Sequence, residues 1–450
     1  MRGFSNKRSS KNRIKKYCRI LFVAGVIAMF IYAADKLYFI PAPVVEGVDA
    51  FTSLPADKTV TLNTRNLKFL NIFINQDIRK IELVRDFSDG DEKTYTIQIK
   101  PKELGLSNGP ARVVIKAESG ILKKINYEIN AMVDTVPPSL EIINAPSVVD
   151  QGSGGFALLR AEDAESVTIK LGGYSFKGFK APSVSGRDAA AAPGSRNRPS
   201  STYFVFFPAP IDIKGESVFY AVAEDAAGNR VVKTLPTRLK TKRFKRSSMN
   251  ISDSFINKVV LPLLDKTDIQ DPVSAFKEVN EQQRATSAKR LIEIAGKTGP
   301  EILWKGPFLQ LKNSKVMAGY GDQRTYLYKG KKISRSIHLG YDLASLANAP
   351  VEASNTGIVM FAGDLGIYGN AVIIDHGLGL MSLYGHLSSI TVEVGRKIKK
   401  GEIIGRTGST GLAGGDHLHF SILLHGYQVS PLYWWDAHWI KVNLTDNFNP

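Results

Sequence analysis

The stretch GDHLHFSILL, residues 415–424, places His417 and His419 two positions apart. Residues two apart share a face only on a β-strand, where Leu418 and Phe420 would lie on the opposite face. The alternation of HLHFSILL is typical of a strand. The sequence therefore predicts a sheet that carries a pair of histidines on one face.

A second motif, HLGYD, lies about eighty residues upstream and adds a histidine and a carboxylate. His338 and Asp342 are four positions apart, which puts both side chains on one face of either a helix or a strand. His386 lies between the two motifs, and all seven histidines of the chain fall between His338 and His438. We therefore expect a metal site or an acid/base site near the C-terminus.

The residue types indicate which metal such a site would hold. Two histidine nitrogens and one carboxylate oxygen form a tripod that suits zinc, and the fourth tetrahedral position is then left to water, as in catalytic zinc sites. Catalysis also needs a group to take the proton of the water and a donor for the oxyanion, and two further histidines are available. A single HxxxD or HxH motif is usually a coincidence, but several motifs in order favour the metal site.

Several segments together resemble the lysostaphin-like (LytM-type) zinc endopeptidases of peptidoglycan. These segments are GYGDQRTY (319–326), HLGYD (338–342), IIDHGLGLMSLYGHL (373–387) and GRTGSTGLAGGDHLHF (405–420). The resemblance covers roughly residues 300 to 440 and implies a β-rich peptidase domain, which we place at 301–450.

The resemblance also implies a role for each site residue. His338, Asp342 and His419 match the zinc ligands of the family. His386 and His417 match the pair that orients and deprotonates the water and stabilises the tetrahedral intermediate. The expected cofactor is Zn²⁺, and the expected substrate is a peptide of peptidoglycan.

The remaining histidines are not expected at the site. His376 lies in the hairpin-like DHGLG, where a structural role is favoured. His425 follows His419 by six strand residues, about 20 Å at the usual strand rise. His438 lies within YWWDAHW (433–439), whose aromatic side chains would either stack on sugar rings or, as we favour, close the domain as a hydrophobic cap.

The N-terminus predicts where the chain works. Residues 1–19 carry eight lysines or arginines and no acid, and residues 20–34 are uninterruptedly apolar or small. This pattern is typical of a signal peptide or a signal anchor. The apolar run is short for a bilayer, which needs about 20 residues, but no small-x-small cleavage site follows Ala34 and the apolar character resumes up to Ile40. We predict a basic cytoplasmic tail and, over 20–40, an uncleaved transmembrane anchor in the inner (plasma) membrane, with the catalytic domain on the periplasmic or cell-wall side.

Composition adds two expectations. Cys18 is the single cysteine and precedes the apolar segment, so the exported part has no disulfide and depends on ordinary hydrophobic cores. The net charge of +17 falls to +9 without the eight charges of the tail, which suits an anionic wall polymer or membrane surface. We expect no nucleic-acid partner, because the apolar segment follows the basic tail at once.

The region between the anchor and the peptidase domain is predicted to be mainly β. Short alternating runs separated by turns predict a β-sandwich module over 42–135. The paired prolines of DTVPPSLEI (134–142) mark a boundary, and FYAVAEDAAGNR (219–230) resembles the closing strand of bacterial immunoglobulin-like modules. A second module, immunoglobulin-like, is therefore predicted over 136–240, with a low-complexity surface loop at 187–201.

A helical linker is predicted over 241–300. Ser252 or Asp253 is expected to cap a first helix, and Asp271 with Pro272 to begin another that ends near Ala295.

The sequence thus predicts a membrane-anchored zinc metalloendopeptidase that hydrolyses peptide bonds in peptidoglycan. The alternative, from another class, is a non-enzymatic scaffold that binds the cell wall or activates a separate murein hydrolase. Members of the resembled family with that role typically lack some zinc or catalytic positions, whereas all of them are present here. Expected partners are peptidoglycan and, through the N-terminal helix, the membrane; a protein regulator is left open.

Overall fold

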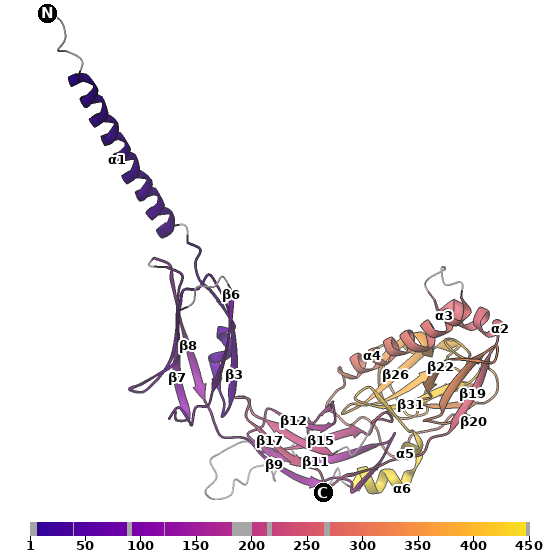
Figure 1. The fold of residues 1–450 in the computed structure, drawn as a ribbon. Coiled ribbons are helices and arrows are strands. Elements are labelled where there is room, and N and C mark those ends of the chain that lie inside the picture. Colours follow the sequence, from indigo (N-terminus) through magenta and orange to yellow (C-terminus); the bar gives the residue numbers. More distant parts are fainter. Residues whose placement is uncertain are drawn as a thin grey trace, which may run out of the picture. The chain divides into compact units, whose positions relative to one another are not determined.

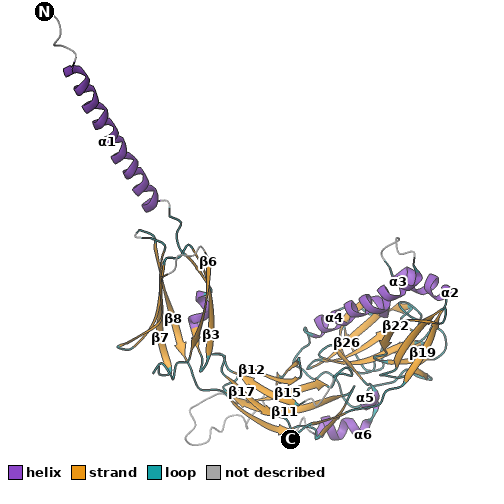
Figure 2. Ribbon diagram, viewed as in Figure 1, coloured by secondary structure: helices purple, strands orange, loops and turns teal. Residues whose placement is uncertain are grey.

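The computed structural model describes residues 7–38, 40–87, 92–120, 122–181, 200–213, 218–264 and 271–446. The chain forms two compact units: the first is Met1–Pro137 with Ala226–Asn229, and the second is Pro138–Asp225 with Arg230–Pro450 (Figure 1). Strands make up most of the regular secondary structure of both units, which confirms the mainly β prediction (Figure 2).

The first unit begins with helix α1 (Lys7–Tyr38), which contains most of the basic tail and the apolar run (Figure 1). Its side chains from Ile20 to Tyr32 are exposed, Phe22 to 74% and Phe30 to 75%. By length and hydropathy, none of the helices in the described part of the chain qualifies as a membrane span. The predicted anchor over 20–40 stays a prediction, and residues 1–6 of the tail lie outside the described residues.

The rest of the first unit consists of two sheets with a shared core. One sheet has the order β1-β3-β6 and the other β2-β8-β7-β4-β5. The bounds are β1 Val44–Glu46, β2 Ser53–Leu54, β3 Lys58–Arg65, β4 Phe69–Gln76, β5 Arg79–Phe87, β6 Glu92–Ile99, β7 Gly109–Glu118 and β8 Lys124–Val133. In β3, burial alternates so that Val60 and Leu62 enter the core, where they join Ile72 and Val113 of the other sheet. This is the sandwich pattern expected from the alternating runs.

The second unit begins with another pair of sheets, ordered β14-β15-β11-β9 and β13-β12-β16-β17, and a short parallel pair β10-β18. The bounds are β9 Ser139–Asn144, β10 Val148–Asp150, β11 Gly154–Glu162, β12 Ser166–Leu171, β13 Tyr174–Lys177, β14 Phe179–Lys180, β15 Ser200–Pro208, β16 Phe219–Glu224, β17 Arg230–Thr234 and β18 Arg238–Lys240. The surface loop predicted over 187–201 lies outside the described residues, except for residues 200 and 201, which begin β15.

Strand β15 joins this sandwich to the C-terminal domain. The residues from Tyr203 to Pro208 are all buried, whereas a strand with one exposed face would alternate. Val205 and Phe207 enter the core of the sandwich, while Phe204 and Phe206 belong to a core shared with the C-terminal domain. The sandwich at 136–240 is therefore not free-standing, because its outer face contributes part of the core of the C-terminal domain.

The C-terminal domain is built on a sheet with the order β20-β23-β31-β27-β26-β25-β29, with β32 beside β31. The bounds are β20 Lys315–Ala318, β23 Tyr341–Ala344, β25 Gly357–Asp364, β26 Asn370–Gly377, β27 Leu380–Gly385, β29 Lys397–Ile398, β31 Leu418–Leu424 and β32 Tyr427–Val429. A small sheet β24-β30-β28 accompanies it (β24 Pro350–Glu352, β28 Ser389–Ile390, β30 Ile403–Arg406). The strand predicted from GDHLHFSILL is thus present as the interior strand β31, whereas His417 lies just before it and makes only an isolated bridge with Gly408.

The segment predicted as a helical linker differs from the prediction. It contains strand β19 (Arg246–Ile251), which pairs in parallel with β21 (Gln323–Tyr328), and β22 (Lys331–Ile337) completes that sheet. Its helical part consists of α2 Asp253–Phe255, π-helix η2 Ile256–Val260, 3-10 helix η3 Leu261–Leu263, α3 Pro272–Lys277, π-helix η4 Glu278–Gln283 and α4 Arg284–Ala295. These helices pack their apolar side chains against the C-terminal sheet, so the segment is part of the domain rather than a linker.

The predicted helix boundaries in this segment are confirmed. The Ser252 hydroxyl accepts the N–H of Phe255 at the first N-cap. The Asp271 carboxylate accepts the N–H groups of the second helix, Pro272 occupies its first turn, and α4 ends at Ala295.

The C-terminal helices α5 (Leu432–Trp435) and α6 (Ala437–Ile440), followed by π-helix η6 (Lys441–Thr445), close the domain. Trp434 is 2% exposed, and its ring centroid lies 5.5 Å from that of Phe308 and 5.8 Å from that of Phe206. The tryptophans of this segment thus form the hydrophobic cap that we favoured over sugar stacking.

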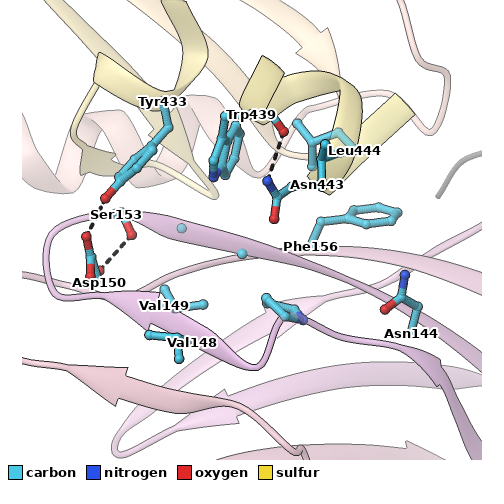
Figure 3. Close-up of a pocket in the computed structure, with 14 residues that line it drawn as sticks. Asn144, Val148, Val149, Asp150, Ser153, Phe156, Tyr433, Trp439, Asn443 and Leu444 are labelled. Atoms are coloured by element: carbon cyan, nitrogen blue, oxygen red, sulfur yellow. Dashed lines mark hydrogen bonds between the residues drawn. The ribbon is translucent and has the colours of Figure 1, made fainter. Parts of the chain in front are cut away.

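A cavity of about 310 Å³ lies between these helices and strands β10 and β11 (Figure 3). At one end, the Tyr433 hydroxyl donates to the Asp150 carboxylate, which also lies 2.8 Å from Lys242 Nζ. At the other end, the Asn443 amide donates to the Trp439 carbonyl over 2.9 Å. No histidine is found among the described residues that line it, so the cavity is separate from the predicted metal site.

Candidate metal centre

Three adjacent segments bring the predicted ligands together. His338 follows β22, Asp342 lies on β23, and His419 lies on the neighbouring strand β31. The antiparallel register pairs Asp342 directly with His419, so their side chains leave the sheet on the same face. The two motifs that are separated by about eighty residues therefore meet across one strand pair.

The ligand atoms form a small triangle. His338 Nε2 lies 2.9 Å from Asp342 Oδ1, His419 Nδ1 lies 3.0 Å from the same oxygen, and the two ring nitrogens are 3.2 Å apart. His338 is 6% exposed, His419 is 4% exposed, and the Asp342 side chain is 15% exposed. This His–Asp–His group can hold a metal ion.

Hydrogen bonds on the far side of each ring fix which nitrogen carries the proton. His338 Nδ1 lies 2.9 Å from the Gly319 carbonyl, which only accepts, so Nδ1 donates and Nε2 keeps its lone pair. The Ser421 hydroxyl gives its single proton to the Leu339 carbonyl, and it must therefore accept from His419 Nε2 at 3.0 Å. Both lone pairs then point into the triangle, as metal ligation requires.

The second oxygen of Asp342 is held by an arginine that the sequence reasoning did not identify. Arg324 lies 3.2 Å from Asp342 Oδ2 and 3.3 Å from Asp322 Oδ2. Ser247 of β19 donates to both oxygens of Asp322 over 2.9 Å. Arg324 lies in the GYGDQRTY segment, whose match to the family was the available signal. The contact leaves Oδ1 alone to face the two histidines.

The two predicted catalytic histidines lie beside this triangle. The ring centroid of His386 is 4.8 Å from that of His417 and 5.8 Å from that of His419. His417 Nε2 lies 3.5 Å from Asp342 Oδ1, and its Nδ1 donates to the Gly415 carbonyl over 2.7 Å. The structure thus brings all five predicted residues into one site.

The backbone at His386 is in the left-handed region, with φ of 63°. Such a conformation is unfavourable for a residue with a side chain, and it is typically kept at functional sites. His386 Nδ1 donates to the Thr410 carbonyl over 2.8 Å, and its N–H donates to the Tyr368 carbonyl over 2.8 Å. These bonds aim the other ring nitrogen, Nε2, away from the loop that contains Thr410 and leave it available for a hydrogen bond.

The pKa values in the site move in opposite directions. Burial raises the pKa of Asp342, but hydrogen bonds from His338, His417 and His419 outweigh it and hold that pKa well below the ordinary value. Burial, aided by the neighbouring histidines, lowers the pKa of His386 to about 3. Burial also lowers the pKa of His417, but the bond to Asp342 overcomes it and raises that pKa. The site therefore combines an ionised carboxylate, a neutral His386 and a His417 that favours its charged form.

The site opens into a cleft of about 600 Å³. The cleft is lined by the metal-binding group, His386, His417 and the loop around Gly414, and also by residues of β19 and of the helices at 252–284. Close packing continues below the triangle: a Cβ on Gly340 would lie 2.5 Å from both His419 Nε2 and Ser421 Oγ.

The other histidines take structural positions, as expected. His376 is fully buried, and its ring bonds to the Thr356 carbonyl at 2.7 Å and to Ser382 at 2.8 Å. His425 donates to the Phe206 carbonyl over 2.9 Å, across the contact between sandwich and C-terminal domain.

Comparison with known proteins agrees with this geometry. Residues 336–431 match the model of peptidase family M23. The chain is 43% identical over 96 residues to the DD-carboxypeptidase/endopeptidase Mpg of Neisseria meningitidis serogroup B, which covers 21% of this chain and 22% of that protein. It is 38% identical over 95 residues to the peptidoglycan DD-endopeptidase ShyA of Vibrio cholerae, with coverage of 21% and 22%. The match thus spans about a fifth of the length of these curated relatives.

Among solved structures, the catalytic domain of the antimicrobial peptidase lysostaphin from Staphylococcus simulans is 31% identical. The alignment covers 28% of this chain and 96% of that domain, with a TM-score of 0.24. The matched family region contains the whole His–Asp–His group together with His386 and His417. The C-terminal domain of this chain is a LytM-type domain of peptidase family M23.

Proposed function

We propose that this chain is a zinc metalloendopeptidase that hydrolyses peptide bonds in peptidoglycan. The observation that carries the proposal is the buried triangle of His338 Nε2, Asp342 Oδ1 and His419 Nδ1, with both ring lone pairs directed inward. A scaffold that only binds the wall has no need for this arrangement, nor for two further histidines beside it.

The donor set fits zinc. A tetrahedral zinc ion with ligands at about 2.0–2.1 Å holds them about 3.3 Å apart, and the three sides of the triangle measure 2.9, 3.0 and 3.2 Å. The required adjustment is a few tenths of an ångström. When bound, zinc would act as a Lewis acid toward the scissile carbonyl and would lower the pKa of a water molecule.

The chain's own residues would orient the reactants and move the proton. The neutral His386 offers Nε2 as an acceptor for the proton of the attacking water, because its Nδ1 is already committed to Thr410. His417, whose pKa is raised beside Asp342, offers an N–H to the oxyanion that develops on the scissile carbonyl. Arg324 keeps Asp342 in place through Oδ2.

The choice of peptidoglycan as substrate is supported by the relatives and by charge. The similar protein of Vibrio is named a peptidoglycan DD-endopeptidase, and that of Neisseria is named a DD-carboxypeptidase/endopeptidase. The net charge of +9 that remains without the basic tail suits work beside an anionic wall.

We further propose that α1 anchors the chain in the inner membrane, with the peptidase on the periplasmic or cell-wall side. Its exposed apolar side chains between Ile20 and Tyr32 form a surface that suits lipid, and eight basic residues precede them. Resistance of the chain to carbonate extraction from membranes is the expected result. Release into the carbonate supernatant would contradict anchoring without affecting the peptidase proposal.

The peptidase proposal is tested on purified sacculi from several wall types. The zinc-loaded full chain is expected to release peptides that mass spectrometry assigns to cleaved cross-links or stems. Asp342→Ala should lose both zinc and product. If the parent protein binds zinc but releases nothing from any sacculus on its own, the enzyme proposal is wrong. Faster hydrolysis by an added murein hydrolase in the presence of the parent protein would then support the activator instead.

A further inference from the structure

Part of the lining of the cleft is contributed by residues upstream of the family match. Phe255 of α2, Phe276 of α3 and Arg284 of α4 line the same cleft as the metal-binding group. The side chains that these helices contribute to the lining are mostly apolar, and Arg284 is the charged one among them.

Arg284 is held in one orientation by Asn280. Its Nε donates to the Asn280 carbonyl over 3.1 Å, and its Nη2 donates to the Asn280 side-chain oxygen over 3.0 Å. Asn280 is 1% exposed, and its amide nitrogen donates to Ser334 and to the Arg335 carbonyl. The two hydrogen bonds that Arg284 donates to this fixed, buried residue preorganise the guanidinium. Its remaining N–H donors are left for a ligand.

The backbone supports the same orientation. Asn280 lies in the π-helical turn Glu278–Gln283, which immediately precedes Arg284. Single π-helical turns within α-helices occur frequently at functional sites.

The charges that line the cleft leave Arg284 without a counter-ion. Arg324 is paired with Asp342 and Asp322, and the Asp416 carboxylate accepts the N–H of Asn348. In the described part of the chain, Arg284 bonds only to the neutral Asn280 and to no carboxylate. A half-buried guanidinium with unused donors is suited to a planar carboxylate, which it can bind with two parallel hydrogen bonds.

Arg284 also lies close to the reacting centre. It lines the same cleft as Tyr368, whose ring centroid is 5.3 Å from that of His419. A carboxylate on Arg284 would therefore belong to a substrate residue near the scissile bond rather than to a distant part of the polymer.

We propose that Arg284 is a specificity-determining residue that binds a free carboxylate of the peptide substrate beside the scissile bond. The inference rests on the proposed peptidase function and narrows its substrate class. Stem peptides that carry free carboxylates are preferred over amidated stems and over uncharged glycine bridges.

The test uses a cross-linked stem-peptide dimer with free carboxylates at the residues flanking the cross-link, and the same dimer with these groups amidated. The full-length, zinc-loaded chain should cleave the carboxylate form with a kcat/KM about 10- to 100-fold higher, the range for a charged hydrogen-bonded pair. Arg284→Gln should abolish this preference, mainly through KM, while its rate on the amidated dimer stays near that of the parent. Arg284→Lys should keep part of it, because lysine retains the charge without the fork.

Lys289→Gln is the matched control, since it removes a positive charge from the exposed side of the same helix and should leave both rates unchanged. Zinc content verifies that each variant has a formed site. If the parent cleaves the two dimers with equal kcat/KM, the inference is overturned, whether or not Arg284→Gln folds. An undiminished preference of folded Arg284→Gln for the carboxylate dimer also overturns it. Absence of cleavage of either dimer and of sacculi would instead overturn the proposed function.

Discussion

Replacement of Gly340 by alanine tests whether His419 is locked in the geometry described above. The new Cβ would lie 2.5 Å from His419 Nε2 and 2.5 Å from Ser421 Oγ, whereas non-bonded heavy atoms at rest are about 3.5–4.0 Å apart. Some atom must therefore move by about 1 Å. The His419 ring cannot turn freely, because Nε2 bonds to Ser421 and the ring packs against Tyr368.

The expected effect has two parts. Overpacking of this kind lowers the free energy of unfolding by about 1–3 kcal/mol. Displacement of a metal ligand that has lost its supporting hydrogen bond weakens zinc affinity by about 10- to 100-fold, and a shift of about 1 Å at the reacting centre slows hydrolysis by on the order of 10². Gly340 does not have a left-handed φ, so the effect is steric and not conformational.

The assay measures zinc by elemental analysis, sacculus hydrolysis and the thermal midpoint on the same preparations. Gly173→Ala in the sandwich is the control, since a Cβ there meets nothing within 4 Å. If Gly340→Ala matches Gly173→Ala in zinc content and hydrolysis, His419 is not held where the structure has it, and the assignment of its tautomer through Ser421 is wrong.

Three further results are expected. His386→Ala should retain zinc while hydrolysis falls by on the order of 10² to 10⁴, whereas His338→Ala should lose both; a fully active His386→Ala would contradict the proton-transfer role. Burial lowers the pKa of His425 from 6.5 to about 4, so its neutral ring contributes stability that is fully present above pH 6.5 and is lost as the pH falls toward 4. The thermal midpoint of the metal-free chain should therefore drop over this pH window, and the midpoint of His425→Phe should drop less. An equal drop in the two proteins would contradict this assignment. Phe206→Ala, at a position 1% exposed in the shared core, should cost about 3–5 kcal/mol and destabilise sandwich and peptidase together in one calorimetric transition; a peptidase transition at the parental temperature would contradict the shared core.

The strand that carries His419 could be predicted from the sequence because its pattern is local. The alternation of HLHFSILL predicts β31, although His417 lies just before that strand and the choice of His419 as a ligand came from the family resemblance. Caps are equally local, and Asp271 with Pro272 marked the start of α3 correctly.

The support of the metal set could not be predicted, because it depends on register between distant strands. Ser421 determines the tautomer of His419 only because its hydroxyl bonds to Leu339, 82 positions away. Arg324 reaches Asp342 only because β21 and β23 belong to sheets that meet at the site. No rule of sequence spacing predicts either contact. The family resemblance pointed to the segment that contains Arg324 but did not assign a role to this residue.

The limits of the domain were misjudged for a related reason. A helix pattern over 241–300 indicates local conformation but not the surface against which the helices pack. The parallel pairing of Arg246–Ile251 with β21 and the burial of Phe276 and Leu291 show that this segment completes the domain. Similarly, only the folded chain shows that Phe204 and Phe206 of β15 belong to a second core.

These misjudged segments bear directly on substrate choice. The family match at 336–431 contains every residue that we assign to metal binding and proton transfer, but the cleft also uses side chains between 249 and 284. A relative that shares the matched region would share the chemistry of the centre and could still differ at Arg284. Selectivity among peptidoglycan peptides should therefore follow the helices packed against the domain, and exchange of residues 271–295 between two such enzymes should transfer the carboxylate preference without changing zinc content. Transfer of that preference with a strand of the matched region instead would place selectivity at the metal side of the cleft.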